Sequence, residues 1–358
     1  MKKAMILSTA LVGLVAGAAQ AEEVTVLSWG GAYEKSQVEA YNKPFAEATG
    51  IDVNMEAADN PATPIKAQVE ANNVSVDVAD VEKSDAIRLC DEGLLEPIDP
   101  DTDLAASPDG TPASEDFIDG SFTDCGVANI VWSTVMSYNS DKVDGEPTSI
   151  ADFFDTAKYP GKRGLRKSAK GTLEFALMGA GVPAADVYKE LGTPEGVDKA
   201  FAELDKIKGD VVWWDAGAQP PQLLADGEVV MSTAYNGRIF NAEVAEGQPF
   251  KIVWDGQLMD FDFFVIPKGA PHMEAAKKYL KFATETQQLA NQAKWISYGP
   301  ARKSSAPMVG MYQDGKTEMG PHMPTAENNM QNALVNDSEF WADHDTELSE
   351  RFNAWLAG

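Results

Sequence analysis

The chain has 358 residues, and its 56 Asp and Glu against 29 Lys and Arg give a formal net charge of -27. Such an acidic surface repels nucleic acid and anionic lipid and favours cationic or zwitterionic partners, although acidity can also serve solubility in a saline medium. A hydrophobic share of 44% is ordinary for a globular protein, so these figures exclude a nucleic-acid-binding protein and leave the ligand open.

The first 21 residues have the pattern of a secretory signal peptide. Lys2 and Lys3 give a positive start, residues 4–18 form an apolar run, and Ala19-Gln20-Ala21 is a small-x-small cleavage site. No later stretch approaches the 18 consecutive apolar residues of a membrane span. We therefore expect cleavage after Ala21 and a soluble, exported protein of about 337 residues, enough for two domains.

The rest of the chain alternates short β-rich runs with amphipathic helices, which predicts an α/β fold with a mostly parallel sheet. Gly50 and Gly93 are expected to end helices, and Thr193-Pro194-Glu195 is typical of a helix start. Strands are expected at 24–28, 51–56, 76–81, 127–138, 229–235 and 263–266. Helices are expected at 34–49, 64–72, 85–92, 193–208, 272–283 and 286–295.

The two cysteines, Cys90 and Cys125, are expected to form one disulfide, because an isolated pair in an exported protein is most simply oxidised. Closing a loop of roughly 36 residues would stabilise the fold by about 3–4 kcal/mol in the chain-entropy model. The histidines His272, His322 and His344 are scattered without metal-ligand spacing. We therefore expect no metal site and no cofactor.

Aromatic and charged side chains recur near the expected ends of strands. The first strand runs into "VTVLSWGGAY", where two glycines separate Trp29 from Tyr33. This is either a tight turn between core aromatics or the lip of a ligand site, since glycine lets a partner approach the backbone. Strand ends line the ligand crevice of open α/β sheets, and aromatic faces beside carboxylates suit an organic ammonium. The residues so placed are Trp29, Tyr33, Asp80, Glu82, Trp132, Trp213, Trp214, Tyr235, Arg238, Trp254, Asp260, Asp262 and Tyr298.

Enzyme motifs are not found. The chain has no G-x-S-x-G, no P-loop and no H-E-x-x-H sequence. Asp260 and Asp262 lie two residues apart on one expected strand, so both can face one cleft as an acid/base pair. A binding protein is the main interpretation, and an exported carboxylate-based hydrolase is the alternative.

The whole mature chain resembles the spermidine/putrescine-binding family of periplasmic ABC-transporter solute-binding proteins. The segments that carry the resemblance are "VLSWGGAYEKSQVEAYNKPFAEATGIDV", "DEGLLEPID", "YPGKRGL", "DGEVVMSTAYNGR", "MDFDFFVIPKGAPHMEAAKKYLKFA" and "ISYGPARK". The resemblance implies a two-lobed α/β fold of the type II periplasmic-binding-protein class, joined by two crossing strands at 127–138 and 229–235. The lobes would comprise 22–135 with 262–303, and 136–261 with 304–358. A monomeric binding protein, not an enzyme, would deliver its ligand to membrane permease subunits.

Transferred residue by residue, the resemblance places Trp29, Tyr33, Tyr235, Asp262 and Tyr298 around the ligand. The full expected set is Trp29, Gly30, Gly31, Tyr33, Glu82, Trp214, Tyr235, Arg238, Asp260, Asp262 and Tyr298.

Two features depart from the family pattern. Residues 165–171 are basic where polyamine binders carry acids, and Arg238 follows Asn-Gly directly. An arginine suits a carboxylate. Two ligand hypotheses therefore stand: a linear polyamine such as putrescine or spermidine, and a compact zwitterion such as γ-aminobutyrate held by Arg238 and Asp262.

Overall fold

The computed structural model describes residues 22–358, so the expected signal peptide lies outside the described residues. Eleven strands form one sheet, whose main order is β2-β1-β3-β9-β5-β8-β6-β7. The strands are β1 Glu23–Ser28, β2 Asp52–Ala57, β3 Val78–Glu82, β4 Phe122–Thr123, β5 Gly126–Asn139, β6 Arg163–Arg166, β7 Val211–Trp214, β8 Met231–Tyr235, β9 Phe250–Val265, β10 Gly299–Pro300 and β11 Leu334–Val335.

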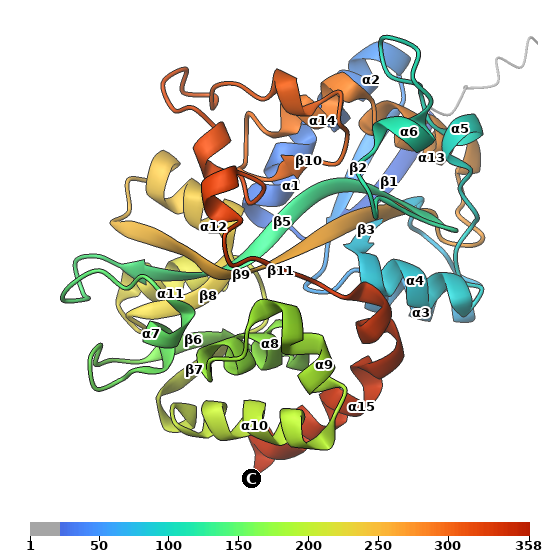
Figure 1. The fold of residues 1–358 in the computed structure, drawn as a ribbon. Helices are drawn as coiled ribbons and strands as arrows, with labels where there is room; N and C mark the ends of the chain where they lie inside the picture. The colour runs from blue at the N-terminus through green and yellow to red at the C-terminus, as the bar shows by residue number, and fades with distance from the viewer. Residues whose placement is uncertain (1–21) are drawn as a thin grey trace, which may run out of the picture.

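Helices cover both ends of this sheet (Figure 1). The α-helices are α1 Gly31–Gln37, α2 Lys43–Thr49, α3 Ala62–Glu70, α4 Lys83–Asp91, α5 Pro100–Asp103, α6 Ala113–Asp116, α7 Ile150–Phe154, α8 Ala169–Gly179, α9 Val187–Leu191, α10 Pro194–Asp205, α11 Gln219–Asp226, α12 Asn236–Phe240, α13 Met273–Ala283, α14 Thr286–Gln292 and α15 Ser338–Ala357. A π-helical turn at Val38–Asn42 joins α1 to α2, and Gly50 ends α2 in the left-handed conformation. No helix in the described part of the chain is long and apolar enough to cross a membrane.

The molecule has two lobes, each with its own apolar core. The first lobe contains β1, β2 and β3, and its core draws on residues 24–128 and 263–301. The second lobe contains β6, β7 and β8, and its core draws on residues 136–258 and 334–356. Figure 1 shows the first lobe at the upper right and the second at the lower left, with β5 and β9 running between them.

The second crossing strand is β9, and the prediction that 229–235 crosses between the lobes is wrong. Strand β9 pairs with β3 in the first lobe (Ala79 with Val265) and continues beside β5 into the second (Asn139 with Phe250). Strand β8 pairs only with β6 and with the second-lobe half of β5. The sequence hides the length of β9 because its register shifts between Val253 and Leu258, where Gly256 takes a positive φ of 71°.

Several elements escape sequence analysis, and two of them matter for the cleft. Strand β6 and helix α8 lie in the basic segment that follows "YPGK", to which no secondary structure was assigned from the sequence. The long C-terminal helix α15 is also missed, and it packs against both α4 and α8.

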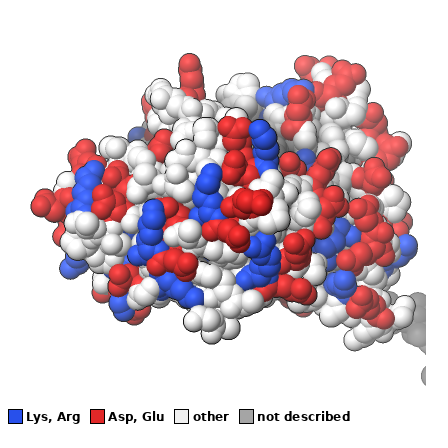
Figure 2. Space-filling view, turned by 60° about the horizontal axis from the view of Figure 1, so that its bottom comes forward, with Lys and Arg blue, Asp and Glu red and all other residues white. Residues whose placement is uncertain are grey.

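Cys90 and Cys125 form a disulfide in the structure, between α4 and the residue preceding β5. Acidic side chains spread over the face in Figure 2, with basic ones between them.

Candidate ligand-binding site

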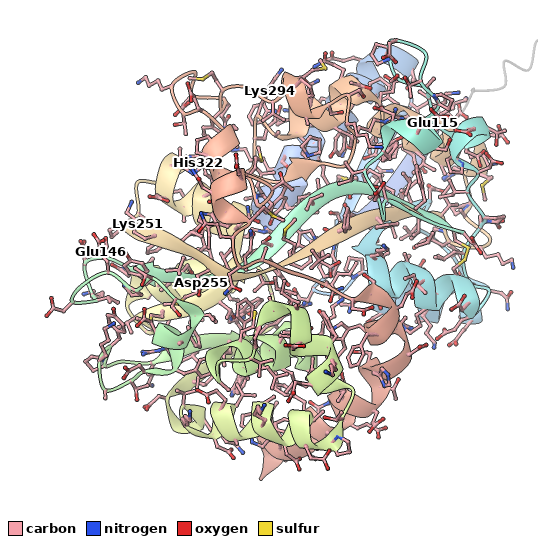
Figure 3. All side chains as sticks on the ribbon, in the orientation of Figure 1. Glu115, Glu146, Lys251, Asp255, Lys294 and His322 are labelled. Atoms are coloured by element: carbon pink, nitrogen blue, oxygen red, sulfur yellow. A yellow bond between two sulfur atoms is a disulfide. The ribbon has the colours of Figure 1, made fainter. Side chains whose placement is uncertain are left out.

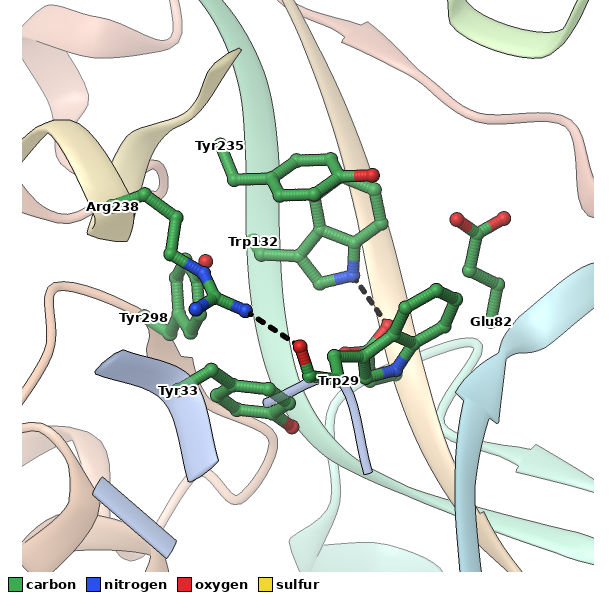
Figure 4. A pocket seen from close by; sticks show the side chains of 8 residues that line it. Trp29, Tyr33, Glu82, Trp132, Tyr235, Arg238 and Tyr298 are labelled. Atoms are coloured by element: carbon green, nitrogen blue, oxygen red, sulfur yellow. Dashed lines mark hydrogen bonds between the residues drawn. The ribbon is translucent and has the colours of Figure 1, made fainter. Parts of the chain in front are cut away.

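A cavity of about 270 Å³ lies between the lobes, where β1 and β3 end beside the crossing strands. Its lining combines aromatic rings with one arginine and two acids (Figure 4). The lining residues are Trp29, Tyr33, Glu82, Trp132, Tyr235, Arg238, Asp262 and Tyr298. The structure thus gathers seven residues of the expected ligand set around one space and adds an eighth, Trp132, which the sequence had placed only among the aromatics near strand ends.

The aromatic rings pack edge to face and form two walls. Tyr33 and Tyr298 meet with ring centroids 5.4 Å apart at 70°. Trp132 and Tyr235 meet at 5.0 Å and 78°. Trp214 packs behind Tyr235 at 5.6 Å and does not line the cavity. Edge-to-face pairs of this kind favour one orientation of each ring.

The two glycines after Trp29 have a structural reason. Gly30 and Gly31 have φ of 66° and 62°, which side chains rarely adopt. A Cβ on Gly31 would overlap Nη1 of Arg238, which lies on α12. The glycine pair therefore allows the guanidinium to reach the end of β1.

Arg238 is buried, with its side chain 5% exposed, and it has no carboxylate partner. Its Nη1 donates to the Gly30 carbonyl at 2.8 Å and its Nη2 to the Trp29 carbonyl at 3.3 Å. Its Nε finds no acceptor, and no carboxylate within residues 22–358 forms a salt bridge with it. Glu243, the neighbour that might have neutralised it, pairs at 2.5 Å with Lys251, which lies at the molecular surface in Figure 3. The arginine keeps donors and positive charge for an anionic group in the cavity.

Asp262 supplies the opposite charge. One oxygen accepts a hydrogen bond from Nε1 of Trp132 at 2.8 Å, and the residue is 5% exposed. Burial raises the pKa of Asp262 well above its usual value, and the carboxylates of Asp80 and Glu82 raise it further. No cation in the described part of the chain forms a salt bridge with Asp262. A ligand ammonium beside Asp262 would therefore lower the pKa of this buried carboxyl and stabilise its ionised form.

Glu82 is in a different electrostatic state, although it lines the same cavity. Arg166 donates to one of its oxygens at 3.0 Å, and Lys170 forms an ion pair with the other. Burial alone would raise the pKa of Glu82, but these two cations outweigh it and lower the pKa to about 2. Glu82 is thus ionised and neutralised from within the protein.

Asp260 and Asp80 lie outside the cavity. Asp260 lines a neighbouring pocket and lies 3.7 Å from Lys170, and burial raises its pKa to about 6. Asp80 is fully buried beneath Tyr33 and accepts from its hydroxyl at 2.7 Å and from Asn129 at 2.9 Å. Burial raises the pKa of Asp80 to about 7. Asp80 therefore positions the Tyr33 ring instead of facing a ligand.

Comparison with known proteins decides the family. A family model described as bacterial extracellular solute-binding protein matches residues 40–325. The chain belongs to this family. The solute-binding protein is 46% identical over 342 residues to a γ-aminobutyric acid-binding protein of Pseudomonas aeruginosa, covering 96% of this chain and 93% of that one.

Solved structures agree with the fold. A periplasmic binding protein of Agrobacterium tumefaciens in complex with glucopine has a TM-score of 0.83 at 31% identity and covers 93% of this chain and 99% of its own. A structure described as a GABA receptor has a TM-score of 0.78 at 33% identity and covers 94% of this chain and 98% of its own. The solute-binding protein thus has the two-lobed type II periplasmic-binding fold that the sequence resemblance implied.

Of the remaining candidates, none completes a metal site. Within residues 22–358 no group of three or more His, Cys, Asp or Glu side chains is arranged to hold a metal ion.

Trp132 is the residue that sequence reasoning grouped with the aromatics but left out of the site. Its signal was present, because it lies on the crossing strand β5 and pairs there with Asp260 of β9.

Proposed function

We propose that this protein is the periplasmic substrate-binding component of an ABC importer and that it captures a compact zwitterion, γ-aminobutyrate or a similar ω-amino acid. The observation that carries the proposal is the presence, in one cavity, of a buried arginine without a carboxylate partner and a buried carboxylate without a cation. Arg238 would bind the ligand carboxylate and Asp262 its ammonium, with the aromatic walls covering the carbon chain.

Similarity to a known binding protein supports a small ligand. The Pseudomonas aeruginosa relative is described as a γ-aminobutyric acid-binding protein and shares 46% of its residues with this chain. A linear polyamine would also leave Arg238 facing a cation, which is unfavourable.

The alternative of a carboxylate-based hydrolase has less support. It needs Asp260 and Asp262 on one reacting bond, but only Asp262 lines the cavity and Asp260 lies beside Lys170. Acid/base catalysis requires both groups within hydrogen-bond reach of the substrate. The separation of the two carboxyls into different pockets favours binding without turnover.

Hinged lobes would give this site its mechanism. We propose lobes of 22–135 with 262–303 and of 136–261 with 304–358, which capture the ligand by bending at β5 and β9. The separate apolar cores support this division, and Arg238 and Asp262 come from opposite sides of it. Closure would place the two charges on the ligand together and present the closed monomer to the permease subunits.

Isothermal titration calorimetry with γ-aminobutyrate, putrescine and spermidine tests the proposal. Arg238→Ala should abolish binding of γ-aminobutyrate, and Asp262→Asn should abolish binding of every amine. Each loss is expected to be about 2–5 kcal/mol, because the remaining charge is left buried without a partner. Lys251→Ala and Asp255→Asn are matched controls that make the same charge changes on β9 outside the cavity. Wild-type affinity in Arg238→Ala, or binding of di- and polyamines only, would refute the zwitterion.

A further inference from the structure

The cavity has a second acid, and the protein neutralises it with its own cations. Glu82 lies on the opposite side of the cavity from Arg238 in Figure 4, with the Trp29 ring between them. Arg166 and Lys170 reach Glu82 from the second lobe, across the cleft. The side chain of Glu82 is 5% exposed and that of Lys170 is 11% exposed, so this cluster is largely shielded from water.

Both oxygens of Glu82 are occupied. Arg166 takes Oε1 at 3.0 Å, and Lys170 takes Oε2. Lys170 is itself fixed from two further sides, because its Nζ donates to Oγ of Ser84 at 2.7 Å and lies 3.7 Å from Asp260. Its position depends on a local turn, since Gly171 has a φ of 85° at the start of α8. The ammonium is therefore held in place and is not a mobile surface charge.

The charges around Glu82 cancel, and this balance disfavours a ligand with a second ammonium. Two acids, Glu82 and Asp260, face two cations, Arg166 and Lys170. A second ligand ammonium at this end would meet two resident cations at short range in a poorly screened space. A ligand with one ammonium and one carboxylate makes no demand on Glu82.

We propose that Lys170, supported by Arg166, determines the specificity of the cavity by occupying, from outside the cavity lining, the oxygen of Glu82 that the second ammonium of a diamine would need. The protein then accepts ligands with a single ammonium and rejects putrescine and longer polyamines. This inference rests on the proposed zwitterion function and identifies the element that works against the competing ligand class.

The variant Lys170→Met tests this directly, because it removes the ammonium and keeps the volume of the side chain. Loss of Lys170 leaves one oxygen of Glu82 buried without a cation, which favours uptake of a ligand ammonium there. In wild type we expect γ-aminobutyrate binding and putrescine binding at least about 100-fold weaker. In Lys170→Met we expect the putrescine affinity to rise by at least about tenfold, with γ-aminobutyrate affinity changed by less than about threefold.

Lys167→Met is the matched control, since Lys167 is exposed in the same segment and forms no salt bridge in the structure. Circular dichroism checks folding, and Lys170→Gln, which can still donate to Glu82 and Ser84, replaces the methionine variant where that variant does not fold. A folded variant that gains no putrescine binding overturns the inference, and so does an equal gain in Lys167→Met. Wild-type protein that binds putrescine as tightly as γ-aminobutyrate also overturns it. Wild-type protein that binds no ω-amino acid refutes the proposed function instead.

Discussion

Replacing Gly31 by alanine should weaken ligand binding although it replaces no residue that lines the cavity. The new Cβ would overlap Nη1 of Arg238, and the guanidinium would have to retreat by roughly 1 Å to reach an ordinary van der Waals separation. It would then lose the 2.8 Å hydrogen bond to the Gly30 carbonyl that holds it in place. A guanidinium displaced in this way would also miss the ligand carboxylate, and one charge-assisted hydrogen bond lost there, about 1.5–3 kcal/mol, corresponds to a loss of affinity of about 10- to 150-fold.

Backbone strain must be separated from this effect. Alanine at the φ of 62° of Gly31 costs about 1–2 kcal/mol of stability wherever it occurs. Gly50→Ala is the matched control, because Gly50 has a φ of 74° and a Cβ there meets nothing within 4 Å. Urea unfolding should show the strain cost in both variants and a further loss in Gly31→Ala from the broken Arg238–Gly30 hydrogen bond, and calorimetry should show weaker γ-aminobutyrate binding in Gly31→Ala alone. Unchanged affinity in Gly31→Ala would refute the assignment of Arg238 as the carboxylate partner.

Two further predictions concern the disulfide and proton linkage. Changing Cys90 and Cys125 together to serine should lower the free energy of unfolding by about 3–4 kcal/mol, which denaturant titration measures, and an unchanged midpoint would contradict it. Because burial and neighbouring acids raise the pKa of Asp262 in the free protein, its contribution to stability is complete below the unfolded pKa and is lost as pH rises through the folded one. A bound ammonium lowers that pKa again, so at about pH 5.5 binding should release protons, seen as different calorimetric enthalpies in acetate and in MES, which both buffer there. Equal enthalpies in the two buffers would show that Asp262 is already ionised.

Sequence reasoning predicted the residues that line the cavity better than it predicted the strands and charge partners that position them. Trp29 follows β1 directly and Tyr33 lies in the first turn of α1, as the pattern of strand, glycines and helix predicts. Asp262 lies inside β9, and the family resemblance placed it at the ligand. Residues whose role depends on distant partners were harder to place. Trp214 packs behind Tyr235 instead of facing the cavity, which no alternation along a four-residue strand can reveal.

Charge partners show the same limit. Nothing in the sequence spacing links Lys170 to Glu82, because they lie on different lobes and meet only across the cleft. The basic segment 165–171 was recognised as unusual, but its pairing partner was not. The full extent of β9 was missed because the bulge around Gly256 breaks the pattern of a continuous strand.

The interleaving of the chain also sets an order of assembly. Strand β3 pairs with β1 on one side and with β9 on the other. Ala79 of β3 therefore gains its partner Val265 only when β9 has been synthesised. Until the last third of the chain is present, the hydrogen-bonding edge of β3 is open, and such edges recruit other strands. An N-terminal fragment ending at Asn139 would therefore contain β1 to β5 without β9 and still expose an edge of β3 prone to aggregation. Pairing across such long sequence separations also slows folding, so this protein is expected to reach its native state only after synthesis of β9 is complete.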